Sequence, residues 1–318
     1  MNFSIRHAKE NDLDLVNLID ENNGTTISLL PNDGATLHAF IIRQKDGTGF
    51  NVIDNYRDAA ELKKEMTRTF KGPKLSPFPC RIPDGRYSFE GKEYRFGHLF
   101  ADGTAIHGLL YDKPFSVLEE KADEGSATVS MQYSYEADDP GYPFRYTCLV
   151  KYSLLPGNVL EVTTTVTNDD RGVIPMADGW HPYWRLGGRA DDWQLQFHSA
   201  AIVDFDDRLV PTGGLSQYGV FETARPLGDT FLDNCFTLKP GLVPPACELY
   251  NPASGLRVSF LPDASYPYLQ IYTPKTRDSI AVENLSGAPD CFNNKMGLVV
   301  LQPGHSQIFT VSYKVSVE

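Results

Sequence analysis

The sequence lacks any segment that would place the chain in or across a membrane. No apolar run approaches the roughly 20 residues that a membrane-spanning helix needs. The first 30 residues carry acidic side chains throughout and contain no uninterrupted apolar stretch, so no secretory signal is evident. We therefore expect a cytoplasmic protein that has no membrane partner.

Cysteine and positive charge are both scarce. The five cysteines are widely spaced, and no two of them form the C-x-x-C pattern of a zinc site or a redox dithiol, so we expect reduced thiols. Lys and Arg total 29 against 41 Asp and Glu, which gives a formal net charge of −12. Because an acidic chain repels the phosphates of nucleic acids on average, we expect no nucleic-acid partner.

Several common catalytic motifs are also missing. The chain contains no H-E-x-x-H, no G-x-x-x-x-G-K-[ST], no G-x-G-x-x-G and no G-x-S-x-G. These absences argue against a zinc protease, a P-loop enzyme, a dinucleotide-dependent enzyme and an α/β-hydrolase. No local spacing of histidine and acidic residues favours a metal site either, and we expect no metal.

The dominant pattern in the sequence is an alternation of apolar and polar residues with a period of two. This pattern is typical of strands with one buried face, and it recurs at 127–135, 144–154, 160–166 and 309–317. The turn-forming residues Pro156, Gly157 and Asn158 separate two of these runs, which predicts a hairpin with long arms. Helical periodicity is convincing in one stretch alone, residues 55–71.

The number of strands determines the predicted fold class. A single open sheet of this size would leave too much apolar surface in contact with water, so two packed sheets are expected. No linker, internal repeat or low-complexity block marks a domain border. We therefore predict one all-β domain over residues 1–318, a large antiparallel two-sheet β-sandwich with few short helices.

The stretch ADGWHPYWRLGG, residues 177–188, surrounds one histidine with large aromatic rings. Such rings suit a sugar site, because one face of a pyranose is apolar C–H and its rim carries hydroxyl groups. Trp180 and Tyr183 are therefore candidate sugar-stacking residues, and His181 is a candidate for acid–base chemistry. An equal alternative for each ring is that it anchors a strand in the core.

Two further candidates lie where an apolar run ends. His107 precedes Gly108 at a point where a strand meets a loop, and small neighbours there would leave room for a ligand. Glu283 ends a short apolar run, where partial loss of water would raise its pKa toward the value that a general base needs. An exposed glutamate at a strand end would have the same pattern.

An arginine and two aspartates complete the list of candidates. Arg81 has uncharged neighbours, which suits an arginine that points inward toward oxygen ligands, although a structural pairing with a carboxylate fits equally well. Asp229 and Asp233 both lie in the acid-rich segment GDTFLDNCFTL. The pattern alone does not choose between these two aspartates.

Taken in order, these segments resemble the aldose 1-epimerase (galactose mutarotase) family. The resemblance extends from about residue 25 to the end of the chain, through SPFPCRIPDGRYSFEGKEY, AIHGLLYDKPF, DDPGYPFRYTCLVKYSL, VLEVTTTVTND, DGWHPYWRLGG, FLDNCFTL and VENLSGAPDCFNN. It implies a galactose mutarotase-like supersandwich and the interconversion of the α and β anomers of a free hexose. It also implies a small-molecule sugar as substrate, no cofactor, and a monomer or homodimer.

The resemblance also implies a role for each residue of the site. Glu283 matches the general base that takes the proton of the anomeric hydroxyl, and His181 matches the general acid that protonates the ring oxygen. His107 matches a histidine that binds near these two oxygens, and Arg81 matches the arginine of the site. Asp233, rather than the other aspartate of its segment, matches the residue that holds sugar hydroxyls.

Other functions on the same fold remain open at this stage. A non-catalytic sugar-binding or sugar-sensing protein would tolerate the loss of Glu283 or His181, so the presence of both favours an enzyme. A hexose-phosphate epimerase would need an additional Arg or Lys near the far end of the sugar, and Arg185 and Arg189 are the candidates. A lyase or glycosidase would need a carboxylate pair or a tyrosine in the cleft.

Overall fold

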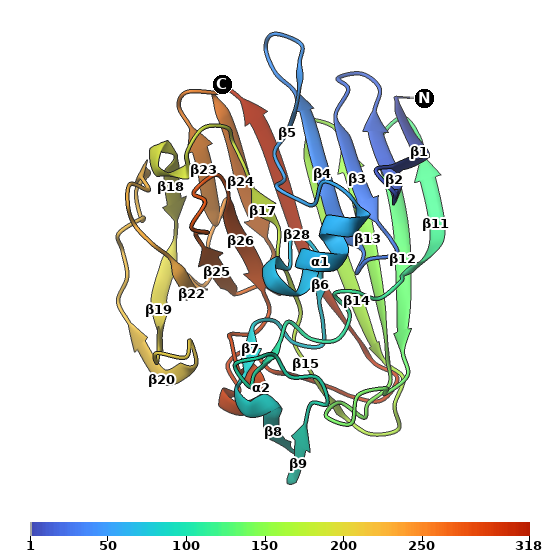
Figure 1. Cartoon of the computed structure of the whole chain (residues 1–318), viewed down its shortest axis with the longest axis vertical. Coiled ribbons are helices and arrows are strands. Elements are labelled where there is room, and N and C mark those ends of the chain that lie inside the picture. Colours follow the sequence, from blue (N-terminus) through green and yellow to red (C-terminus); the bar gives the residue numbers. More distant parts are fainter. Residues whose placement is uncertain (1) are drawn as a thin grey trace.

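A nine-stranded antiparallel sheet forms one layer of the protein in the computed structural model, which describes residues 2–318 (Figure 1). In spatial order its strands are β11 (Ser116–Ala122), β12 (Ala127–Tyr135), β13 (Tyr146–Leu155), β14 (Val159–Asn168), β28 (Ser306–Val317), β24 (Leu256–Pro262), β23 (Cys247–Asn251), β18 (Gln194–Phe197) and β21 (Arg225–Pro226). This sheet brings together strands from the middle and the C-terminal end of the chain.

Two sheets make up the opposite layer. One contains β1 (Phe3–Glu10), β2 (Leu13–Asp20), β3 (Thr26–Leu30), β4 (Thr36–Arg43) and β5 (Gly49–Asn51). The other contains β20 (Pro211–Ser216), β19 (Ser199–Phe205), β22 (Asp233–Leu238), β25 (Tyr268–Tyr272), β26 (Ile280–Leu285), β16 (Gly179–Trp180) and β6 (Lys74–Leu75), and β17 (Tyr183–Trp184) also pairs with β26.

Contacts across the interior show how the layers face each other. Strands β1 and β2 contact β11, β12 and β13, at one end of the nine-stranded sheet. Nearer its other end, Trp184 of β17 packs against Phe260 of β24 and Tyr313 of β28. An isolated bridge between Ile53 and Trp184 joins the two sheets of the second layer. The predicted all-β sandwich is confirmed, with one layer divided between two sheets.

The remaining elements are short. Three two-stranded sheets pair β7 (Arg81–Ile82) with β10 (Ala105–Ile106), β8 (Arg86–Phe89) with β9 (Lys92–Arg95), and β15 (Ile174–Met176) with β27 (Val299–Leu301). Single 3₁₀ turns occur at Pro83–Gly85 and Ala190–Asp192. In Figure 1, β7, β8, β9 and α2 (Cys291–Asn294) lie at the lower end of the molecule, opposite both termini.

The predicted helix at residues 55–71 is present as α1 (Ala59–Thr69). It begins where the Asp58 side chain accepts a hydrogen bond from the Glu61 N–H, and it ends at Phe70, whose φ of 48° cannot continue a right-handed helix. Leu62 and Met66, four residues apart, are its buried side chains. Within residues 2–318, no helix is both long and apolar enough to cross a bilayer.

The hairpin of β13 and β14 forms as predicted. Along β14 the side chains of Leu160, Val162, Thr164 and Val166 are buried, and the positions between them are only partly buried, which follows the period of two. Gly157 and Asn158 both have positive φ, which matches the tight turn expected there. The hairpin buries one face of each arm between the layers.

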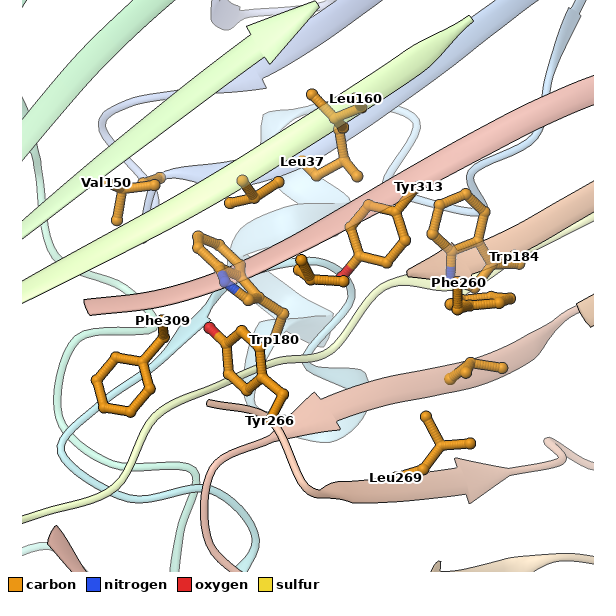
Figure 2. Packing of buried hydrophobic residues seen from close by; sticks show 14 of the residues in the cluster. Leu37, Val150, Leu160, Trp180, Trp184, Phe260, Tyr266, Leu269, Phe309 and Tyr313 are labelled. Carbon is orange, nitrogen blue, oxygen red and sulfur yellow. The ribbon is translucent and has the colours of Figure 1, made fainter. Parts of the chain in front are cut away.

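Large aromatic side chains fill the space between the layers (Figure 2). Figure 2 shows Trp180 close to Tyr266, and Trp184 beside Phe260 and Tyr313, all of them buried. The five cysteines are also buried and unbridged, at positions 80, 148, 235, 247 and 291. Segments 100 or more residues apart therefore share one apolar interior.

One ion pair lies completely inside this interior. The Lys74 ammonium is 2.5 Å from Asp178 Oδ2 and donates to the Gly179 carbonyl at 3.0 Å, and both charged side chains are fully buried. The Tyr266 hydroxyl donates to the same carboxylate oxygen at 2.6 Å, and the ammonium lies 4.1 Å from the centre of the Trp180 ring. Burial lowers the pKa of Lys74 and raises the pKa of Asp178, and each partner opposes the shift of the other.

Removing one partner of this pair should destabilise the protein strongly. Asp178→Asn leaves the Lys74 ammonium buried without a counter-charge, and we expect the free energy of unfolding to fall by roughly 3–5 kcal/mol. Urea titration at pH 7 measures the change. Glu21→Gln, which breaks the exposed pair with Arg6, is the matched control and should leave the unfolding midpoint unchanged. A loss below about 1 kcal/mol for Asp178→Asn would contradict a stabilising role of the pair.

Candidate active site

Strand register places two of the predicted residues directly opposite each other. Strand β26 pairs with both β16 and β17, and Tyr183 of β17 faces Ala281 of β26. The same antiparallel register sets His181, two residues before Tyr183, opposite Glu283, two residues after Ala281. Their side chains are buried, and His181 Nε2 lies 3.3 Å from Glu283 Oε1. An imidazole and a carboxyl group therefore form a close pair.

The same face of the sheet continues across two more strands. Gln270 of β25 is paired with Glu283, and Asp233 of β22 is paired with Tyr272. Residues opposite each other in a sheet point to the same side, so these side chains share one face with His181. In the adjacent row the small residue Ala281 lies between Tyr272 and Tyr183, whose rings meet edge to face with centroids 6.4 Å apart.

The structure corrects the prediction that Trp180 stacks on the sugar. Successive side chains of a strand point to opposite faces, so Trp180 cannot share the face of His181. Its side chain is 2% exposed and packs edge to face on Tyr152, in the core shown in Figure 2. Trp180 is a core anchor, whereas Tyr183 shares the face of His181, and its ring stacks on His181 with centroids 5.0 Å apart.

His107 is held by reciprocal hydrogen bonds to the residue before Arg81. The Cys80 N–H donates to His107 Nδ1 at 3.2 Å, and the His107 N–H donates to the Cys80 carbonyl at 2.8 Å. Because Nδ1 accepts, the proton of the neutral ring lies on Nε2. The His107 ring contacts His181 edge to face at 5.0 Å and Phe70 at 4.6 Å. His107 thus presents an N–H donor beside the His181–Glu283 pair.

Gly108 has a different role from the one expected. A Cβ atom at this position would lie 2.2 Å from the carbonyl oxygen of Ser76, and φ is +76°. The glycine therefore allows a close approach of two backbone segments, joined by the hydrogen bond from Leu109 N–H to the Ser76 carbonyl at 2.7 Å. It thereby fixes the position of the loop that carries His107.

A cavity of about 220 Å³ lies between the sheet face, the His107 loop and the end of α1. It brings together six of the seven predicted residues. Trp180, discussed above, is outside it, and so is Asp229, which is exposed. The lining residues are Thr67, Arg68, Thr69, Phe70, Cys80, Arg81, Ile106, His107, His181, Tyr183, Asp233, Gln270, Tyr272 and Glu283.

Arg81 and Asp233 add opposite charges to the cavity wall. Arg81 stands on β7, where Ile106 is its partner in the strand register. The ion pairs among residues 2–318 do not include Arg81, so the alternative of a structural ion pair is not realised there. Asp233 Oδ1 accepts a hydrogen bond from Gln270 Nε2 at 3.0 Å. Burial raises the pKa of Asp233, and the charge of Arg81 opposes that shift.

Burial is the first cause of the pKa shifts at the centre of the site. It raises the pKa of Glu283 well above its ordinary value; the charge of Asp233 adds to the shift and that of Arg81 opposes it. Burial lowers the pKa of His181 to about 3, and Arg81 contributes to the lowering. The pKa of His107 is lowered well below its ordinary value by burial, then by His181 and Arg81. The protein environment by itself therefore favours an uncharged pair with the proton on Glu283.

Three buried polar atoms of cavity residues have no hydrogen-bond partner in the protein. They are His181 Nδ1, Gln270 Oε1 and Glu283 Oε2. Buried polar groups are normally paired, so such atoms in one cavity indicate a ligand that supplies hydrogen bonds. A polyhydroxylated ring provides both donors and acceptors. The described residues 2–318 contain no group of three or more His, Cys, Asp or Glu arranged to hold a metal ion.

Sequence reasoning missed several lining residues. Gln270 and Tyr272 were not singled out, although in the strand sequence YLQIY they alternate with Leu269 and Ile271, which signals a face opposite to the core. The end of α1, at residues 67–69, was also missed. The end of the helix reaches the cavity because of the path that the chain takes after the helix. No local sequence pattern predicts that path.

Comparison with known proteins identifies the family. The family model for aldose 1-epimerase matches residues 15–314. YihR, an uncharacterised protein of Escherichia coli K12, is 27% identical over 299 residues, which cover 91% of this chain and 93% of YihR. The sequence resemblance to this family is thus confirmed over nearly the whole chain.

Solved structures agree on the fold. A galactose mutarotase-like protein of Clostridium acetobutylicum has a TM-score of 0.87 at 17% identity, covering 100% of this chain and 99% of that one. A galactose 1-epimerase of Lactobacillus acidophilus has a TM-score of 0.82 at 21% identity, with 99% of each chain covered. At such identities the likeness establishes the galactose mutarotase-like sandwich and leaves the substrate open.

Proposed function

Because the chain belongs to the aldose 1-epimerase family, we propose that it interconverts the α and β anomers of a free hexose by acid–base catalysis. The observation that carries the proposal is the buried pair of His181 Nε2 and Glu283 Oε1, 3.3 Å apart in a cavity of about 220 Å³. Opening a pyranose ring requires that one proton be removed and another delivered within one sugar. A carboxyl group beside an imidazole supplies both functions.

The proposed ring opening moves two protons. The Glu283 carboxylate accepts the proton of the anomeric hydroxyl, and the electrons of that O–H bond form the C1=O1 carbonyl. The C1–O5 bond breaks, and its electron pair on O5 takes a proton from the His181 imidazolium. The products are the open-chain aldehyde, a protonated Glu283 and a neutral His181.

Ring closure reverses these transfers after a rotation. Rotation about the C1–C2 bond presents the other face of the aldehyde to O5. As O5 attacks C1, its proton returns to His181, and O1 takes the proton from Glu283. The protonation states at the end equal those at the start, so the cycle consumes no proton and no redox equivalent.

His181 and Glu283 together hold one proton, which either residue can carry. The protein environment places this proton on Glu283, whereas the proposed reaction begins with it on His181. Transfer between Nε2 and Oε1 converts one form into the other without a change in net charge. A sugar hydroxyl that donates to the Glu283 carboxylate stabilises the charged form, so substrate binding itself favours the reactive state.

The other lining residues hold the sugar in this proposal. The His107 N–H, directed by its hydrogen bond from Cys80, donates to an oxygen near C1. Asp233 accepts hydrogen bonds from sugar hydroxyls, and Arg81 donates to them. Tyr183, stacked on His181, covers part of the ring with its aromatic surface.

A non-catalytic sugar-binding role needs only part of this arrangement. Asp233, Arg81 and Tyr183 would suffice to retain a sugar. The close burial of an imidazole and a carboxyl group is costly, and a pair that can exchange a proton is more than the binding of a sugar requires. This pairing favours the epimerase over a sugar sensor.

Replacing the proposed base should abolish catalysis. Glu283→Gln keeps the size of the side chain and removes its ability to accept a proton, so kcat should fall by about 10²- to 10⁴-fold. Polarimetry of freshly dissolved α-glucose or α-galactose measures the catalysed rate above the spontaneous one. Glu119→Gln, on the exposed face of β11, is the control and should retain the wild-type rate. Near-normal catalysis by a folded Glu283→Gln variant would reject Glu283 as the base.

The pH dependence follows from the shifts of the pair. A second proton binds only when the pH falls toward the His181 pKa of about 3, and the last proton leaves only above the raised pKa of Glu283. The singly protonated pair therefore persists far into the acid range, and kcat/KM should stay level between pH 7 and pH 5. A loss of activity on acidification, with a midpoint at the ordinary histidine pKa of about 6.5, would contradict these shifts.

A further inference from the structure

The ring of His181 is oriented without a hydrogen bond at its second nitrogen. Nε2 faces Glu283 Oε1 at 3.3 Å, whereas Nδ1 is buried and has no hydrogen-bond partner among residues 2–318. A histidine that carries out acid–base chemistry is commonly held by a hydrogen bond to its other nitrogen. Because the described chain supplies no such bond, the orientation of His181 before a sugar binds depends on packing against its neighbours.

Aromatic contacts supply this packing. The Tyr183 ring stacks on His181 with centroids 5.0 Å apart and planes inclined by 12°, and the His107 ring meets His181 edge to face at 5.0 Å. The stack with Tyr183 fixes the plane of the imidazole and with it the direction of Nε2. In a closely packed interior, a displacement of the Tyr183 ring would therefore move His181 relative to Glu283.

The Tyr183 ring is in turn held by an ion pair. The Lys71 ammonium lies over this ring, 5.9 Å from its centre, and 2.8 Å from Asp54 Oδ2. Asp54 accepts a further hydrogen bond from the Ser279 hydroxyl at 3.1 Å, and its own N–H donates to the Tyr183 carbonyl at 2.9 Å. The two charged side chains are only 22% and 21% exposed, so water screens their contacts less than at an open surface.

Lys71 belongs to a short segment that contacts both histidines of the site. This segment, residues 70–72, directly follows α1. The Phe70 ring lies 4.6 Å from the His107 ring, and the Gly72 N–H donates to the His181 carbonyl at 2.9 Å. The segment therefore contacts the backbone and the rings of the site from the side of the helix.

We propose that Lys71, paired with Asp54, is a positioning residue of the site. It holds the Tyr183 ring against His181, and this keeps Nε2 directed at Glu283. Neither Lys71 nor Asp54 lines the cavity, so the pair acts on the reaction through the two rings and makes no contact with the sugar. The inference rests on the proposed function and assigns a further residue to the same site.

Kinetics of Lys71 variants test this role, with glucose and galactose as substrates in polarimetry. Lys71→Met keeps an unbranched side chain and removes the charge. We expect kcat to fall by at least about tenfold and KM to change by less than about twofold, because the acid group is misaligned while the contacts to the sugar remain. Lys71→Arg keeps the cation beside Asp54 and should retain most of kcat. Lys64→Met, at an α1 side chain that is 74% exposed, is the control and should leave both constants unchanged.

The partner of Lys71 gives an independent check. Asp54→Asn removes the other charge of the pair and should lower kcat to a similar extent. Combining Asp54→Asn with Lys71→Met should cause little further loss, because either change alone already breaks the pair. If the two losses multiply instead, the residues act independently, and the positioning role of the pair is wrong.

An NMR measurement follows the His181 ring itself and needs no substrate. Proton–nitrogen correlation spectra of isotope-labelled protein resolve the ring nitrogens of the histidines, and His181→Gln identifies the signals of His181. Wild-type protein should show a single set of signals for this ring. Lys71→Met should shift or divide that set, and Lys64→Met should leave it unchanged.

The two measurements separate the positioning role from the proposed function. If wild-type protein is active and Lys71→Met keeps its kcat, the role of Lys71 is wrong and the epimerase activity stands. A rise in KM at unchanged kcat would assign Lys71 to sugar binding and would also overturn the role. If wild-type protein accelerates no aldose, the proposed function fails, and the His181 signals alone decide whether Lys71 positions the ring.

Discussion

The site depends on one constraint, the antiparallel register between β26 and the interrupted strand β16–β17. Because Tyr183 faces Ala281, His181 faces Glu283, and two residues about 100 positions apart in the sequence meet at 3.3 Å. The alternation of side chains along the strand then sends Trp180 to the core. A slip of one residue would exchange the two faces and place the tryptophan in the cavity.

The core maintains this register and sets the electrostatics of the site. Beneath the strand that carries His181, the buried pair of Lys74 and Asp178 joins β6 to the segment before β16. Burial then separates the site groups from water, raises the pKa of Glu283 and lowers that of His181. The two opposite shifts keep a single proton on the pair across a wide pH range, which suits a reaction that moves protons within one substrate and releases none.

Much of the fold and part of the site are predictable from the sequence. Period-two alternation and turn residues predict the long hairpin and the sandwich, because both signals are local. The division of one layer into two sheets depends on contacts between segments that are distant in the sequence, and so does the approach of Arg68 to the cavity. Trp180 does not line the cavity, because neighbouring residues of a strand point to opposite faces and His181 takes the cavity face. Aromatic composition alone does not reveal this alternation. Lys74 gives no sign of burial, since a lysine in a sequence ordinarily indicates surface.

The most direct test of the account is a crystal structure with a bound aldose. We expect the anomeric hydroxyl within hydrogen-bond distance of Glu283, the ring oxygen beside His181, and the far end of the sugar toward solvent. A sugar bound with C1 at the rim, or outside this cavity, would contradict the account.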